Sequence, residues 1–417
     1  MGKTYKIRGG KAIAAGGFGC IFKPALKCKG SRKKYNGVSK LMFNKLAKNE
    51  MEEIEQIKPI IQTIPNYNNY FIINNITSCK PAKLSSSDLV NYNTCSNFLK
   101  YDLTKNMINT NIDNVSIINI PNGGIDILKW FTNNDTPTKS KLNIHNLQKL
   151  NLSLIDILKN AIIPMNKRRL FHLDIKSENI LVDKNYNLKI IDWGLSAIQK
   201  HNDVPDRVKY ARVFQYNLPL SNILFNSLLQ TSINKYKSHK SSEKFQKIAV
   251  DYSKLIIMEN GNGHIDTIKY IIRNIYQHQN SLRTAISVNN VIKNYLAQIL
   301  QTFTDKNVFN IKAYFNNVYS HNADIWGFLT IYSYISIFMQ SSKIKNKQAI
   351  TKQISDIVIK YCYSTLYSDK PIPINNLIAD LNKITALLST RSISKYRRSI
   401  KNKQTSRRKT SRNTKRI

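Results

Sequence analysis

Three polar residues suited to phosphate chemistry lie close together in residues 171–196, which read FHLDIKSENILVDKNYNLKIIDWGLS. They are Asp174, Lys176 and Asn179, and a second carboxylate, Asp192, follows thirteen positions after Asn179. A carboxylate can accept the proton of a hydroxyl group, and a lysine can neutralise charge on a phosphate. Carboxylate and amide oxygens are also ligands of Mg²⁺. Residues of these types could act on a phosphoryl group, and their spacing allows them to converge.

The segment between Asn179 and Asp192 has the pattern of a β-hairpin. ILV at 180–182 and LKII at 188–191 are short apolar runs, and DKNYN between them is a turn sequence. Such a hairpin would bring Asn179 and Asp192 to the same end, where both oxygens could hold magnesium.

The same residues resemble the catalytic and metal-binding loops of the protein kinases, H-R-D-x-x-x-x-N followed by D-F-G. Leu173 replaces the usual Arg and Trp193 the usual Phe, a version most similar to the serine/threonine kinases of large DNA viruses. The resemblance covers about residues 14–220 and a short island near 324. It implies an α+β, bilobal protein-kinase-like fold with a small β-rich N-lobe and a large helical C-lobe, using ATP and Mg²⁺.

A glycine cluster near the N-terminus has apolar residues on both sides, in the stretch KAIAAGGFGCIFK at 11–23. Backbone amides of such a turn can approach phosphates because no side chain intervenes. The stretch resembles the kinase glycine-rich loop, with Ala14 at the place of the first glycine. The resemblance implies these nucleotide-binding residues: Ala14, Gly16, Gly17, Phe18, Gly19 and Ile21.

A lysine in an apolar strand and a helix with acidic residues follow this loop. Lys40 lies in GVSKLM, and apolar residues at three- and four-residue intervals predict an amphipathic helix over 44–64. By the resemblance, Lys40 contacts the nucleotide phosphates and pairs with an acid of this helix. Glu53 is best placed for the pair and Glu50 is the second choice. The backbone near Ile118 and Ile120 is expected to meet adenine.

Further elements follow in an order that matches the resemblance. Residues 67–77 and 114–120 have strand character, while 78–113 are polar and receive no role. A long helix is expected over 145–165, and a segment corresponding to the kinase activation segment over 199–217. QYNLPLSNILF then forms the expected floor of the substrate groove. Asp324 and Trp326 resemble the D-x-W that opens the buried central helix of the large kinase lobe.

These features divide the chain into three expected regions. The N-lobe covers 1–120, the C-lobe 121–388 with a basic helical insertion at about 226–319, and a disordered basic tail 389–417. Residues 391–417 contain twelve Lys or Arg and no Asp or Glu. The whole 417-residue chain carries a formal charge of +39, which favours anionic partners such as nucleic acid.

Five scattered cysteines without a C-x-x-C pair argue against a disulfide framework and for a reducing compartment. We also expect no signal peptide and no membrane span, because the longest apolar run, 327–339, is too short. The expected location is cytoplasmic, meaning the host cytoplasm or the virion if the protein is viral.

The leading hypothesis is ATP-dependent phosphorylation of Ser or Thr hydroxyls on protein substrates. Asp174 would be the base, Lys176 would stabilise the transferred phosphate, and Asn179 and Asp192 would hold magnesium. One alternative is a small-molecule or lipid kinase of similar fold. Another is an inactive kinase-like scaffold that binds nucleic acid through its basic surface.

Overall fold

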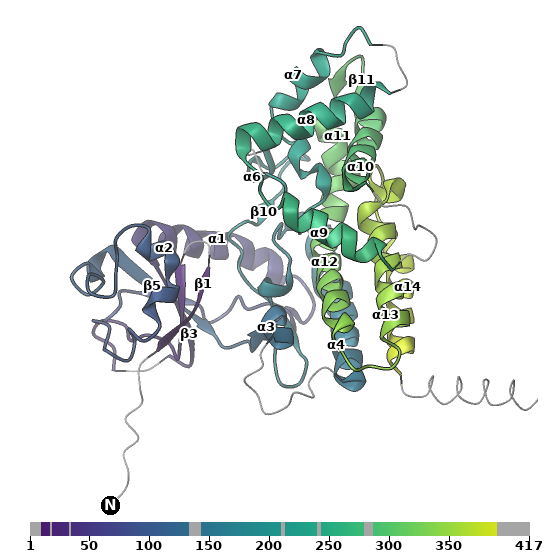
Figure 1. The fold of residues 1–417 in the computed structure, drawn as a ribbon. Coiled ribbons are helices and arrows are strands. Elements are labelled where there is room, and N and C mark those ends of the chain that lie inside the picture. Colours follow the sequence, from purple (N-terminus) through teal and green to yellow (C-terminus); the bar gives the residue numbers. More distant parts are fainter. Residues whose placement is uncertain are drawn as a thin grey trace, which may run out of the picture. The chain divides into compact units, whose positions relative to one another are not determined.

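The computed structural model describes residues 10–16, 19–32, 35–132, 143–209, 213–239, 243–278 and 287–389. Its contacts divide the chain into two compact units (Figure 1). The strand unit comprises Met1–Ile125 and Leu181–Gly194, and the helical unit comprises Asp126–Ile180 and Leu195–Ile417. Apart from Ser389, the expected basic tail lies outside the described residues, as do Gly17 and Phe18 of the glycine cluster.

The strand unit is built on a five-stranded antiparallel sheet in the order β1-β2-β3-β5-β4. The expected glycine hairpin is present, since β1 and β2 pair up to Gly16 opposite Gly19. Of the two stretches with strand character, 114–120 forms β5, but 67–77 does not form one strand. Its first residues make a 3-10 turn, and β4 includes only the last of them. The strands are β1 Lys11–Gly16, β2 Gly19–Lys23, β3 Gly37–Phe43, β4 Thr77–Cys79 and β5 Val115–Pro121.

Helix α1 (Asn44–Gln62) confirms the expected amphipathic helix. Its buried positions recur at intervals of three and four residues and include one acid, Glu50. Met42, Ala47 and Ile118 form a small core where α1 meets the sheet.

Of residues 78–113, for which the sequence suggested no role, those that follow β4 supply much of the core of the strand unit. Leu84, Tyr92, Phe98 and Ile108 are buried against Phe22 and other residues of the sheet. The short helices of this insertion are η2 Tyr92–Thr94, α2 Ser96–Leu99 and η3 Ile112–Asn114. The insertion is therefore a packed part of the unit.

Two disulfide bonds fasten this insertion and the strand next to it, contrary to the sequence-based expectation. Cys20 bonds to Cys95 and Cys28 to Cys79, with Cα–Cα distances of 5.2 and 5.8 Å. The cysteines are scattered in sequence, but pairing of the strands and packing of the insertion bring them within disulfide range. The argument for a reducing compartment therefore fails, while Cys362 is a free, buried thiol.

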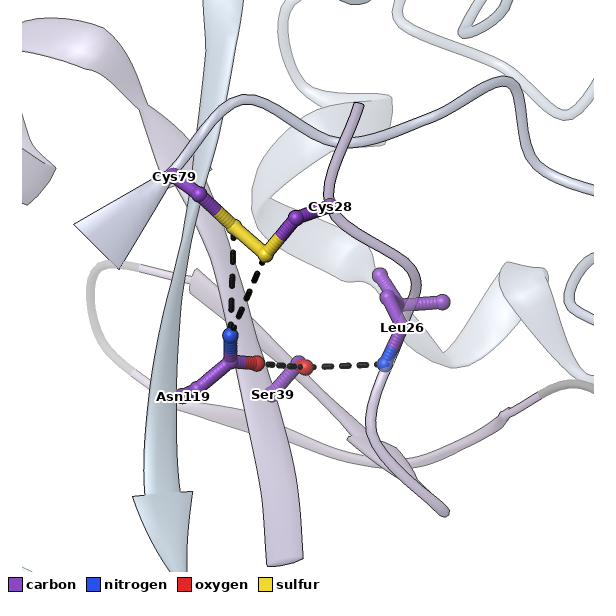
Figure 2. The surroundings of a disulfide bond; sticks show 5 residues. All are labelled: Leu26, Cys28, Ser39, Cys79 and Asn119. Carbon is purple, nitrogen blue, oxygen red and sulfur yellow. Dashed lines mark hydrogen bonds between the residues drawn. A yellow bond between two sulfur atoms is a disulfide. The ribbon is translucent and has the colours of Figure 1, made fainter. Parts of the chain in front are cut away.

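Figure 2 shows how the polar neighbours of the Cys28–Cys79 disulfide are satisfied. Ser39 Oγ accepts the N–H of Leu26 at 2.8 Å and donates to Asn119 Oδ1 at 2.6 Å. Asn119 Nδ2 in turn faces the two sulfur atoms at 3.5 and 3.8 Å. The disulfide thus rests on buried side chains of β3 and β5.

The strand unit also receives the later hairpin, as the sequence predicts. β8 (Ile180–Val182) pairs with β9 (Leu188–Ile190), and β6 (Ile125–Asp126) extends this small sheet where the chain passes from one unit to the other. Ile190 donates its N–H to Tyr70 O at 2.8 Å, which joins β9 to the chain after η1 (Tyr67–Asn69).

The helical unit surrounds α12 (Ser320–Gln340), which is buried along most of its length. This confirms the expected buried helix at the D-x-W island. α4 (Ile144–Ile157), a π-turn Leu158–Ile162 and α5 (Ile163–Lys167) run continuously and confirm the expected long helix. α4 packs on α14, and α13 packs on both α12 and α14 (Figure 1).

The remaining elements of the helical unit are short pieces near the site and the helices of the insertion. The short pieces are α3 Ile127–Thr132, β7 Leu170–Phe171, η5 Ser177–Asn179, β10 Ala197–Ile198, α6 Asp206–Lys209 and η6 Leu220–Leu224. The insertion contains α7 Leu228–Asn234, α8 Lys244–Asn260, α9 Ile265–Tyr276, α10 Val288–Phe303, β11 Thr304–Asp305, β12 Val308–Phe309, α11 Ile311–Tyr314 and a π-turn Phe315–Tyr319. The last elements are α13 Lys347–Val358, a π-turn Ile359–Tyr363, η9 Thr365–Tyr367 and α14 Ile374–Leu388.

Candidate active site

Asp174 is the centre of a set of hydrogen bonds within the helical unit. Lys176 Nζ lies 3.0 and 2.9 Å from its two carboxylate oxygens. Asn179 Nδ2 donates to Asp174 Oδ2 and to its carbonyl oxygen, both at 2.8 Å. The structure therefore brings together the three residues that the sequence places on this loop, with Asp174 buried and Lys176 partly exposed.

Asn217 completes this set and was not identified from the sequence. Its Nδ2 donates to Asp174 Oδ1 at 2.8 Å, and its side chain is buried. The only signal in the sequence is a polar residue at the start of the apolar run LPLSNILF. Four side-chain donor contacts, from Lys176, Asn179 and Asn217, thus fix the orientation of one carboxylate.

The backbone of the loop is held by α12. Asp324 accepts the N–H groups of His172 at 2.8 Å and Leu173 at 2.7 Å. Burial raises the pKa of Asp324, although His172 and the two backbone N–H groups oppose the increase. Trp326 Nε1 donates to the carbonyl oxygen of Tyr216 at 3.1 Å, so the D-x-W pair holds both segments that meet at Asp174.

Gly327 allows α12 to approach these segments closely. A Cβ atom at this position would lie 2.5 Å from Ile175 O and 2.9 Å from Asn217 O. Any larger residue would therefore displace the loop or the helix. Asp324, Trp326 and Gly327 together set the distance between the central helix and the polar cluster.

The insertion also contacts this cluster through the residues before α9. His264 donates its N–H to Phe214 O at 2.8 Å, and its ring centroid lies 5.3 Å from that of Tyr216. Burial lowers the pKa of His264, and the nearby cation of Lys176 lowers it further. The insertion therefore supports the segment that carries Asn217.

Lys40 forms a buried ion pair in the strand unit, with Glu50 as its partner. Lys40 Nζ lies 2.6 Å from Glu50 Oε2 and 3.8 Å from Asp192 Oδ1. Glu53 is the partner expected from the sequence. Glu50 takes the place because it lies within the buried stripe of α1, three residues after Ala47 and four before Ile54.

The electrostatics of this pair keep the lysine protonated. Burial by itself lowers the pKa of Lys40, but the carboxylates of Asp192 and Glu50 outweigh burial, and the net pKa is raised. Lys40 is therefore a fixed cation beside Asp192, whose own side chain is 38% exposed. Trp193, which replaces the usual Phe, is buried with its ring centroid 5.8 Å from that of Phe71.

The residues expected at the nucleotide have different environments. Ala14 and Ile21 are register partners in the glycine hairpin, and Gly19 lies over β3. Ile118 lies in the middle of the sheet, opposite Lys40 of β3 and Ser78 of β4. Ile118 therefore has a neighbouring strand on each side, β3 on one and β4 on the other. Ile120 is paired only with Val38, beyond the last pair of β4.

Each of the two units offers an oxygen atom of a type that binds Mg²⁺. The amide nitrogen of Asn179 is used by Asp174, which leaves the Asn179 Oδ1 oxygen as an acceptor for a cation. Asp192 offers a partly exposed carboxylate in the strand unit. Among the described residues, no three His, Cys, Asp or Glu side chains form a separate metal site.

Comparisons with known proteins match the part of the chain that contains Asp174 and Asp192. The protein kinase domain family matches residues 139–215. CBL-interacting protein kinase 1 of Oryza sativa subsp. japonica is 41% identical over 63 residues, 15% of this chain and 13% of that protein. CBL-interacting serine/threonine-protein kinase 10 of Arabidopsis thaliana is 51% identical over 41 residues, 10% and 9% of the two chains. Dual specificity protein kinase zakA of Dictyostelium discoideum is 44% identical over 48 residues, which are 12% of this chain and 6% of that protein.

These matches span 6–13% of the length of the three relatives. Together with a sheet-containing unit and a mostly helical remainder, they confirm the kinase-like α+β fold class. Within the described parts of the chain, no helix has the length and apolar character needed to cross a membrane.

Proposed function

We propose that this protein is an ATP-dependent protein kinase that phosphorylates Ser or Thr hydroxyl groups. The observation that supports the proposal most is the cluster in which Lys176, Asn179 and Asn217 all donate to the carboxylate of Asp174. A carboxylate fixed in this way can orient an acceptor hydroxyl and take its proton. The serine/threonine kinases among the similar proteins favour the same acceptors.

Each remaining residue has a proposed role in this reaction. Lys176, partly exposed, would neutralise charge on the transferred phosphate while it restrains Asp174. Asn179 and Asp192 would hold Mg²⁺, which neutralises the phosphates of bound ATP. Lys40 would contact those phosphates from its pair with Glu50. The glycine hairpin and the backbone at Ile120 would contact the nucleotide, whereas the backbone of Ile118 would not, because it lies between two paired strands.

The proposal extends to the origin of the protein, the role of its basic tail and the bounds of its lobes. Leu173 and Trp193 support an origin among the kinases of large DNA viruses, because both stand in the motif versions typical of that group. The basic tail, 391–417, would bind a polyanion such as nucleic acid. We also propose that residues 1–120 form the N-lobe and residues 121–388 the C-lobe.

The proposal is tested by incubating the protein with Mg²⁺, ATP labelled at the γ-phosphate, and Ser, Thr or Tyr versions of one basic peptide. We expect labelled Ser and Thr peptides, and a loss of 10²–10⁴-fold in turnover for Asp174→Asn, roughly the effect of a lost acid–base residue. Asp192→Ala should lose activity because it removes a proposed Mg²⁺ ligand. Asp305→Asn removes an exposed carboxylate of the same unit and should retain full activity. Unchanged turnover in Asp174→Asn would falsify the assignment.

We further propose that activity does not require phosphorylation of residues 199–217. Leu173 is buried and cannot pair with a phosphate as an arginine would, and the segment contains no Ser or Thr. Of its two tyrosines, Tyr216 is buried and directs its hydroxyl to Glu178. Treatment with a phosphatase should leave the rate of peptide labelling unchanged. A rate that falls, together with a mapped phosphate at Tyr210, would contradict this proposal.

A further inference from the structure

The helical unit contains a cavity of about 890 Å³ that is separate from the cluster around Asp174. Its walls come from the end of α5, β7, the segment 310–317, the first turns of α12, and residues 371–374. Its volume lies within the usual range for pockets that bind small molecules. None of Asp174, Lys176, Asn179 and Asn217 lines it. We call it the basic cavity.

The floor of the basic cavity is apolar and its rim is cationic. Phe171, Ile325 and Ile372 line it and are buried. The exposed side chains that line it include four basic residues, Lys167, Arg169, Lys312 and His321. No Asp or Glu is among its described lining residues. Such a surface suits a ligand with an apolar body and an anionic end.

Some of these basic groups are held in place and others are open to a ligand. Arg169 donates to Gln199 Oε1 at 2.7 Å, and Lys312 Nζ lies 2.8 Å from Asp203 Oδ1. In the described part of the chain, Lys167, Asn317 and His321 have no side-chain hydrogen bond or ion pair. The rim therefore combines two oriented cations with donors that have unused capacity.

From these contacts we infer that the basic cavity binds a small organic phosphate, with the phosphate at Lys167, Arg169 and Lys312 and the apolar body on the floor. Phosphate oxygens accept charge-assisted hydrogen bonds from several cations at once, and amide groups such as that of Asn317 can add donors. A purely apolar ligand would leave the cations unused, and a cation would be repelled.

The cavity is connected to the catalytic loop through one wall residue. With its amide nitrogen turned toward α12, Asn166 donates to Asp324 Oδ2 at 2.8 Å and to Leu170 O at 3.2 Å. Asp324 is the same carboxylate that holds the backbone of His172 and Leu173. A ligand in the basic cavity would therefore stabilise the wall on which that loop depends.

The test uses phenyl phosphate, which has one apolar ring and one phosphate, in calorimetric and NMR titrations of the full chain. We expect saturable binding with one site, at least tenfold tighter than inorganic phosphate or benzyl alcohol. Lys167→Glu and Lys312→Glu should each weaken binding about fivefold or more, roughly the value of one exposed ion pair. Asn317→Trp, at an exposed position that lines the cavity, should weaken binding by occupying part of the cavity without a change of charge.

Two variants serve as matched controls. Lys254→Glu has the same charge change on α8, at a different and smaller cavity, and should bind phenyl phosphate like the wild type. Lys40→Ala removes the proposed nucleotide cation and should also leave binding unchanged, which separates this inference from the proposed kinase activity. No saturable binding, an equal loss in Lys254→Glu, or full binding in Asn317→Trp would each overturn the inference.

Discussion

Removal of the two disulfides should destabilise the strand unit by several kcal/mol. The bonds join residues 75 and 51 positions apart, and the shorter loop lies inside the longer one. In the chain-entropy treatment, the Cys28–Cys79 loop alone stabilises the fold by about 4 kcal/mol at 25 °C. With the inner loop already closed, the Cys20–Cys95 bond closes only the segments 20–28 and 79–95, about 24 residues in all. It then adds about 3.5 kcal/mol to the free energy of unfolding.

Measured effects of native disulfides are commonly smaller, about 2–4 kcal/mol each, so we expect a total loss of at least about 4 kcal/mol. For a unit of this size, that corresponds to a fall in Tm of about 12 °C. The assay is thermal unfolding with and without dithiothreitol, together with hydrogen exchange of residues 84–117. Exchange should increase there, because this segment packs against the sheet next to the bonded cysteines.

The matched control is a variant with Cys20→Ala, Cys95→Ala, Cys28→Ser and Cys79→Ser. Its Tm should equal that of the reduced wild type and should not respond to dithiothreitol, since only the buried thiol of Cys362 is left. The reasoning is refuted if the denatured, unreduced wild type shows five reactive thiols. It is refuted equally if reduction shifts Tm but leaves exchange in 84–117 unchanged.

Three further predictions concern the helical unit. Asn217→Ala should lower kcat for peptide phosphorylation about tenfold without changing the KM for ATP, because Asp174 loses one restraint; a loss confined to KM would refute this role. Gly327→Ala should cost about 2 kcal/mol in chemical denaturation, since the new Cβ would meet Ile175 O at 2.5 Å. Burial raises the pKa of Asp380, but hydrogen bonds from Lys383, Lys360 and Tyr361 outweigh burial and lower this pKa from 3.8 to about 2. Its stabilisation, up to about 2 kcal/mol, is thus complete above pH ~4 and lost as pH falls toward 2; the gap between wild type and Asp380→Asn in urea unfolding should close over that window.

The parts of the fold that could be predicted are those specified by local patterns. The glycine hairpin, α1, the β8–β9 hairpin and α12 each have a hydrophobic period or turn signal within a short stretch. The choice between Glu50 and Glu53 was harder, because both lie on one helix near its apolar face. Only the position of Ala47 and Ile54 in the buried stripe decides it.

The features that could not be predicted depend on contacts between distant residues. The bond between Cys20 and Cys95 requires the insertion to pack beside β2, and nothing in the spacing of five cysteines indicates that packing. Asn217 reaches Asp174 across 43 positions because α12 holds both segments. A polar residue in an apolar run indicates a buried partner, but the sequence does not identify the partner.

The arrangement around α12 explains how the loop can be ordered without an arginine at position 173. Leu173 has a φ of +57°, a conformation that a branched side chain adopts only when its surroundings enforce it. The enforcing contact is the hydrogen bond from its own N–H to Asp324, next to the bond from His172. Asp324 is buried and part of the chain itself, so this contact does not depend on a modification. The loop is therefore ordered from the core of the helical unit.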